Sequence, residues 1–181
     1  MDSLCFVHGF AGGRHKSWEK DDIFWPGDFL AEDLHNNARI LSWGYDGYNS
    51  GSVESDAMSL AQLKEQNSAR NLLRSIFGVA FMGTPFLNED QELQNWLRHC
   101  EQAYNTKLKV MYFCEIGELD DRQTVASTRT PHGIPNILLE AEHRDTCKYS
   151  SRVDENYQKV LKVLREWVEE IRATGHDSSV S

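Results

Sequence analysis

The residues best suited to chemistry stand just after short apolar runs. A glycine-rich stretch, HGFAGG, begins at His8 and follows the apolar residues 4–7. Glycines at the carboxyl end of a strand let backbone amides point into the crevice where open α/β sheets bind ligands. Such amides can stabilise the oxyanion that forms during acyl transfer. We therefore predict an oxyanion loop at Gly9 and Phe10, whereas His8 itself is more typical of a structural histidine.

A carboxylate and a histidine follow later apolar runs, in the order that acyl-transfer chemistry uses. Glu115 comes directly after a strongly apolar run, where a carboxylate can orient a histidine and stabilise its protonated ring. His143 follows the next such run, so the acid precedes the base in the chain, as in the order serine, acid, histidine. Two alternatives stay open for Glu115. It could be an ordinary surface residue, and Asp120 or Asp121 in the following loop could replace it as the acid.

The serine that such a pair would serve is missing. A serine nucleophile of this kind sits on a sharp strand-to-helix turn with the pattern G-x-S-x-G, which occurs nowhere in the chain. The closest string is GYNSG at 47–51, in which Ser50 stands one place too late. The interval from Tyr48 to Gly78 is also shorter than the roughly 35 residues that a helix, a strand, the turn and a second helix need. It contains no β-branched apolar run that could form a central strand.

The elements that must position these residues alternate along the chain. Apolar runs rich in strand-forming residues alternate with helical patterns, which predicts a mainly parallel sheet with helices on both faces. The predicted strands are 4–7, 38–43, 79–82, 108–114 and a weaker 137–139, and the predicted helices are 27–34, parts of 55–74, 88–104 and 154–172. We expect a single α/β domain over 1–172 and a disordered polar tail over 173–181.

The last predicted helix has the clearest pattern. Its apolar residues recur three and four positions apart and form one stripe. They are Tyr157, Val160, Leu161, Leu164, Trp167, Val168 and Ile171. We expect this stripe to pack against the sheet and the charged residues to form a solvated outer face.

Composition excludes several classes of protein. The chain has 19 Lys and Arg against 28 Asp and Glu, a formal charge of −9, and no basic stripe, so a nucleic-acid partner is not expected. The four cysteines are scattered and read as reduced structural thiols. The sequence has neither a signal-peptide core nor an apolar run of about 18 residues that could span a membrane, so the default expectation is a cytoplasmic protein. No cofactor is expected.

Several segments in register resemble the SERAC-type family of lipase-like, serine-active-site α/β-hydrolases, in its fungal branch. Together they cover more than half of the chain, in the family's order. They are FVHGFAGG (6–13), Trp18, FWP (24–26), ARILSWGYD (38–46), GVAFMGTP (78–85), KVMYFCE (109–115) and AEHRDTCKYSS (141–151).

The resemblance implies a shortened α/β-hydrolase fold that lacks the nucleophile turn. It places the catalytic acid at Glu115 and the base at His143, and it implies a lipid or ester substrate in complete relatives. It also associates the family with the endoplasmic reticulum and mitochondria. The chain departs from the family again after Pro85, where a loop is absent. Two internal losses fit either a reduced copy or a gene model with misjoined exons, and loss of a central strand should join strands that normally lie apart.

Three functional hypotheses follow. The leading one is an esterase- or lipase-like protein that is inactive as written. The alternative is a non-catalytic pseudo-hydrolase that acts as a protein-interaction domain, with an unknown protein partner. A metal-dependent hydrolase built on His8, His15, Asp21 and Asp22 is a third idea, although these residues lack a recognised ligand spacing. His132, between two prolines, is interpreted as a loop residue.

Overall fold

The core of the protein is a parallel β-sheet. The computed structural model describes residues 1–9, 13–43, 71–72, 74–84, 98, 102, 108–115, 133–142 and 144–174. Its five-stranded sheet has the order β4-β1-β5-β6-β7, and every neighbouring pair is parallel. The strands are Ser3–Val7 (β1), Arg39–Trp43 (β4), Ile76–Met82 (β5), Lys109–Glu115 (β6) and Asn136–Leu139 (β7). They match the five predicted runs, so the α/β fold class is confirmed.

β1 and β5 are hydrogen-bonded to each other in the middle of the sheet. Cys5 pairs with Val79 and Val7 with Phe81, and the register shifts once, between Ser3 and Leu4. Because the two strands are directly paired, no other strand lies between them. The sheet thus joins two segments that are separated by the whole of residues 8–75 in the chain.

One face of the sheet is covered by the long helix α5, Glu155–Ala173. The Asp154 side chain caps its start by accepting hydrogen bonds from the amides of Asn156 and Tyr157, at 2.9 and 3.0 Å. All seven residues of the predicted stripe are buried, which confirms that prediction. The helix lies very close to the sheet at Gly78, where an added Cβ would stand 2.4 Å from the Trp167 ring.

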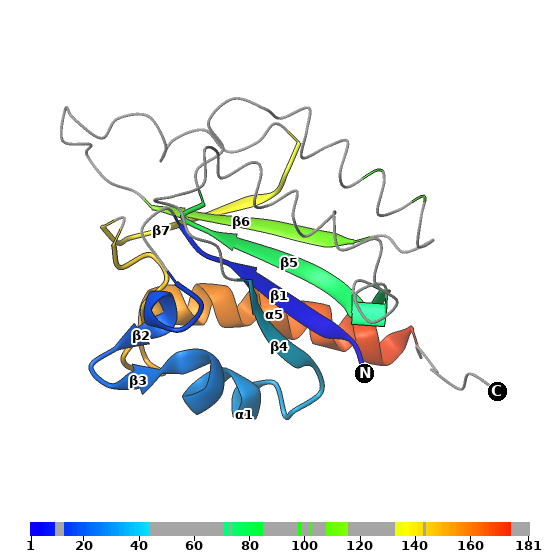
Figure 1. The fold of residues 1–181 in the computed structure, drawn as a ribbon, viewed down its shortest axis with the longest axis horizontal. Helices are drawn as coiled ribbons and strands as arrows, with labels where there is room; N and C mark the ends of the chain where they lie inside the picture. Colours follow the sequence, from blue (N-terminus) through cyan, green and yellow to red (C-terminus); the bar gives the residue numbers. More distant parts are fainter. Residues whose placement is uncertain are drawn as a thin grey trace.

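A second group of elements packs on the same face as α5 (Figure 1). A short 3₁₀ turn η1, Lys16–Trp18, leads into the hairpin β2, Glu19–Lys20, and β3, Ile23–Phe24. The π-helix η2, Pro26–Leu30, then continues into α1, Ala31–Asp33. Together they cover most of the helix predicted for 27–34. The hairpin was not predicted, because two-residue strands leave no periodic signal.

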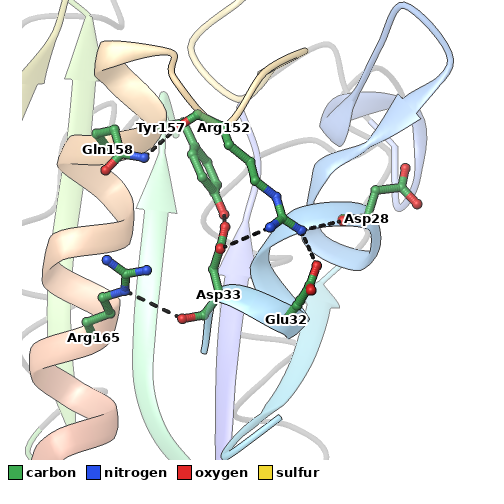
Figure 2. A network of polar contacts seen from close by, with 7 residues as sticks. All are labelled: Asp28, Glu32, Asp33, Arg152, Tyr157, Gln158 and Arg165. Atoms are coloured by element: carbon green, nitrogen blue, oxygen red, sulfur yellow. Dashed lines mark hydrogen bonds and ion pairs between the residues drawn. The ribbon is translucent and has the colours of Figure 1, made fainter. Parts of the chain in front are cut away.

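Polar contacts tie α1 to the start of α5 (Figure 2). The Arg152 guanidinium forms ion pairs with Glu32 and with Asp33, at 3.5 Å from the latter, and lies 5.5 Å from the centre of the Phe29 ring. The Tyr157 hydroxyl donates a 2.5 Å hydrogen bond to the Asp33 carboxylate. Burial and this bond raise the pKa of Tyr157, so its hydroxyl stays protonated. These contacts fix the helix relative to the N-terminal group of elements.

The opposite face of the sheet carries a separate apolar cluster. Its buried members are Cys5, Val7, Ile76, Val79, Phe81, Val110, Tyr112, Cys114 and Ile134. Residues 71, 72, 74, 98 and 102, within the segments predicted as helices 55–74 and 88–104, are helical, and most of those segments lies outside the described residues. No helix within the described part of the chain is long and apolar enough to cross a membrane.

Candidate functional site at the carboxyl edge of the sheet

Polar side chains gather where the parallel strands end. β1 is followed by His8 and Gly9, β5 by Gly83 and Thr84, and β6 ends at Glu115. Parallel strands bring their carboxyl ends to one edge, which is where open α/β sheets bind ligands. Three of these side chains are buried in spite of their polarity: His8 and Thr84 are 0% exposed and Glu115 is 7% exposed. We call this group the carboxyl edge.

Thr84 connects three strands at this edge. Its hydroxyl lies 3.0 Å from the Val7 carbonyl oxygen and 3.2 Å from that of His8, and donates its hydrogen there. Its own carbonyl oxygen accepts a hydrogen bond from the Tyr112 hydroxyl of β6. Thr84, shortly after β5, therefore holds the end of β1 in place, where the predicted oxyanion loop begins.

The ring of His8 is held in one tautomer. Nδ1 lies 2.7 Å from the Gly9 carbonyl oxygen, and because a carbonyl only accepts, Nδ1 carries the hydrogen. The ring lies edge-on to Trp18, with 6.4 Å between ring centres. Burial lowers the pKa of His8 below 6.5, and the bond to Gly9 raises it by less. His8 is thus mainly neutral at pH 7, which agrees with a structural histidine.

The Glu115 carboxylate lies beside Gly83. A Cβ built on Gly83 would stand 3.6 Å from Oε2 of Glu115 and 3.5 Å from the side chain of Thr146. Gly83 also has a φ of +59°, in the region that favours glycine. The sharp turn after β5 thus brings the end of β5, the acid at the end of β6 and the buried Thr146 together. Glu115 is therefore not an ordinary exposed residue at a strand end.

Cys147 lies beneath the same edge. Its thiol donates to the Met82 carbonyl oxygen at 3.2 Å, and its own carbonyl accepts a 2.8 Å hydrogen bond from the Trp25 indole. Burial raises the pKa of this thiol to about 12, a hydrogen bond from the Gly9 backbone lowers it by less, and the Glu115 carboxylate adds to the increase. The thiol stays protonated and links β5 to the turn after β1. The Gly9 amide therefore faces this sulfur.

Several predicted site residues lie outside the described residues. They are Phe10 of the oxyanion loop, the base His143, the alternative acids Asp120 and Asp121, the loop residue His132 and the segment searched for the nucleophile. The structure thus brings Gly9 and Glu115 to one edge and leaves His143 a prediction from the sequence. Thr84, Thr146 and Cys147 were not predicted as site residues, although each stands in a segment that carries the family resemblance.

The described residues proposed for a metal site are used in other contacts. His15 stacks on Phe24, with 4.2 Å between ring centres, and pairs with Glu19 at 3.1 Å. Asp21 and Asp22 form the turn of the hairpin, with φ values of 53° and 61°. Among the residues that the structure describes, no three His, Cys, Asp or Glu side chains are grouped so that they could hold a metal ion.

No model of a known protein family matches the chain, and a search among curated proteins finds no match.

Proposed function

We propose that this chain is an α/β-hydrolase-fold protein of the serine-esterase type which, as written, has no catalytic activity. The observation that carries the proposal is the buried Glu115 carboxylate at the carboxyl end of β6, beside the turn at Gly83. In acyl-transfer sites a carboxylate in this position orients the histidine base. His143 is the residue that we assign to that role.

The pairing of β1 with β5 supports the absence of the nucleophile. A sheet that loses a central strand has to join the strands that flanked it, and β1 and β5 are joined in the centre of this one. The nucleophile turn would follow such a strand. Without the serine, acyl transfer has no nucleophile, and the rate that binding and electrostatics alone supply is too small to detect. In subtilisin, removing the serine lowers kcat by a factor of about two million.

A fluorophosphonate probe tests the proposal directly. The probe forms a covalent bond to an activated serine, and we expect no labelling of the folded, purified chain. A complete serine esterase labelled in parallel shows that the probe is active, and circular dichroism shows that the chain is folded. Labelling that disappears in the His143→Ala variant would overturn the proposal, because a serine activated by His143 would then be present.

Transcript sequencing tests whether the missing segment is real. We expect the messenger RNA to encode the interval from Leu60 to Ser68 as written. An in-frame insertion with the pattern G-x-S-x-G in this interval would show that the complete protein has its nucleophile. The inactivity would then not be a property of the complete protein.

A further inference from the structure

Within the described part of the chain, β7 is an outer strand of the sheet. It stands last in the strand order and pairs with β6. The Pro135 carbonyl accepts a 3.0 Å hydrogen bond from the Tyr112 amide of β6, and the register sets Asn136 opposite Tyr112. Because alternate residues of a strand direct their backbone groups to opposite sides, those of residues 136, 138 and 140 point away from β6. A further strand would have to pair with these groups.

Asn156, in the first turn of α5, already pairs with the last of these residues. Its side-chain oxygen accepts a 3.0 Å hydrogen bond from the Glu140 amide, and its side-chain nitrogen donates a 3.0 Å bond to the Glu140 carbonyl. One side-chain amide thus makes the two bonds that a residue of an antiparallel strand would make. Lys159 Nζ lies 3.4 Å from the Leu138 carbonyl oxygen and 3.7 Å from the Glu140 carboxylate. We call Asn156 and Lys159 the edge cap.

The edge cap covers only part of the β7 edge. No hydrogen bond within the described part of the chain uses the Leu138 amide or the backbone groups of Asn136. The Leu138 side chain is 51% exposed, and Asn136 is exposed as well. An exposed strand edge with unpaired amides and carbonyls is a template for another strand. The cap therefore closes one half of a surface whose other half is open.

We propose that the edge cap prevents β7 from pairing with β7 of a second copy of this chain. The outward groups are centred on Leu138, so an antiparallel, twofold pairing sets Leu138 opposite itself and Asn136 opposite Glu140. This arrangement packs two exposed leucines side by side and places no like charges directly opposite each other. It also requires the Leu138 carbonyl and both backbone groups of Glu140, which the cap occupies. The inference concerns assembly and is independent of the proposed function.

Removing the edge cap tests this inference. The double variant Asn156→Ala, Lys159→Ala frees the edge and keeps the start of α5 capped, because Asp154 bonds the backbone amide of Asn156 and not its side chain. Sedimentation equilibrium measures self-association, at about 0.15 M salt to screen the formal charge of −9. We expect the dissociation constant of the dimer to fall about 10-fold or more below that of the wild type. The wild type must first break the capping contacts in both copies.

The double variant Gln158→Ala, Lys162→Ala is the matched control. It also removes one side-chain amide and one lysine from α5, so the change in charge is the same. Gln158 donates to the Arg152 carbonyl, and no described contact joins either side chain to β7. Self-association of this control should match that of the wild type. If the control dimerised as strongly as the variant without the cap, the effect would come from charge and the inference would be wrong.

Hydrogen exchange shows whether β7 is the surface that pairs. The Leu138 amide points away from β6 and should exchange fast in the wild type. In the variant without the cap it should become slow as the protein concentration rises, whereas the Ile137 amide, on the β6 side, should stay slow throughout. Adding Leu138→Lys to that variant places a charge at the centre of the edge and should return the protein to a monomer.

Asn156→Asp provides a milder version of the test. An acidic residue suits the first turn of a helix, so the fold should be retained, and circular dichroism checks this. The carboxylate keeps an acceptor for the Glu140 amide and loses the donor to the Glu140 carbonyl, so the dissociation constant should fall by less than in the double variant. Unchanged self-association in both capping variants, dimers that survive Leu138→Lys, or dimers in which the Leu138 amide still exchanges fast would each overturn the inference.

Discussion

Side chains on both faces of the sheet and at its carboxyl edge are buried, but the two kinds of region are held together differently. The face beneath α5 is an apolar surface on which shape complementarity decides the packing, as the close approach of Trp167 to Gly78 shows. At the carboxyl edge the buried side chains are polar, and directional hydrogen bonds such as those of Thr84 and Cys147 hold them. A face should therefore be sensitive to added volume, and the edge to lost hydrogen-bonding atoms.

This difference also suggests where function can develop. Apolar packing offers a ligand few polar groups to recognise. The edge holds a neutral histidine, a carboxylate and several backbone amides and carbonyls within a few residues of the strand ends. Polar groups that are already desolvated interact strongly with a bound ligand.

The largest expected effect tests whether the carboxyl edge excludes water as fully as the faces of the sheet do. Cys5 on a sheet face and Cys147 at the edge both have a pKa raised to about 12, chiefly by burial, from an ordinary value of 9.0. Above pH 9 the unfolded thiols lose protons that the folded ones keep. The free energy of unfolding should therefore fall as the pH rises from about 9 to about 12, by about 4 kcal/mol for each thiol at the end of that range.

Urea denaturation at several pH values, with a reductant present, measures this slope. Cys5→Ala and Cys147→Ser each remove one ionisable thiol, and the serine keeps a donor for the Met82 carbonyl. Both variants should show a shallower fall above pH 9, and to a similar degree. If the free energy of unfolding of Cys147→Ser alone fell with pH as steeply as that of the wild type, water would reach the carboxyl edge. The edge would then differ from the faces in burial as well as in chemistry.

The next largest effect tests the packing of the face beneath α5. In Gly78→Ala the new methyl group would stand 2.4 Å from two atoms of the Trp167 ring, so the ring or the helix that carries it must shift. We expect the free energy of unfolding to fall by about 3 kcal/mol, measured by urea denaturation with circular dichroism. Adding Trp167→Phe should restore part of that loss, because the smaller ring makes room.

Gly13→Ala is the matched control for this substitution. Within the part of the chain that the structure describes, no heavy atom lies within 4 Å of a Cβ built at Gly13. The same chemical change should therefore leave stability nearly unchanged or slightly raise it. Equal losses in the two variants would show that the general effect of replacing glycine, and not the contact with Trp167, is responsible.

The faces were predictable from the sequence in a way that the edge was not. The stripe on α5 and the five strands follow from periodicity and apolar runs, which are local signals. The contacts of Thr84 with Val7 and of Cys147 with Met82 join residues far apart in the chain, and nothing local marks them. Gly9 and Glu115 were singled out because each stands at the carboxyl end of an apolar run. His143 and Phe10 remain predictions from the sequence.

The smallest expected effect tests the hydrogen bonds of the edge. Thr84→Val keeps the volume of the side chain and removes the hydroxyl that donates to the carbonyls of Val7 and His8. We expect a loss of about 1 kcal/mol in the free energy of unfolding, with faster hydrogen exchange at the His8 and Gly9 amides. Thr84→Ser keeps the donor and should preserve slow exchange.

The reciprocal variant Val79→Thr places a hydroxyl in a fully buried apolar face, where it should also destabilise the protein. If Thr84→Val were neutral, apolar packing would hold the edge as it holds the faces, and the distinction between the two regions would fail.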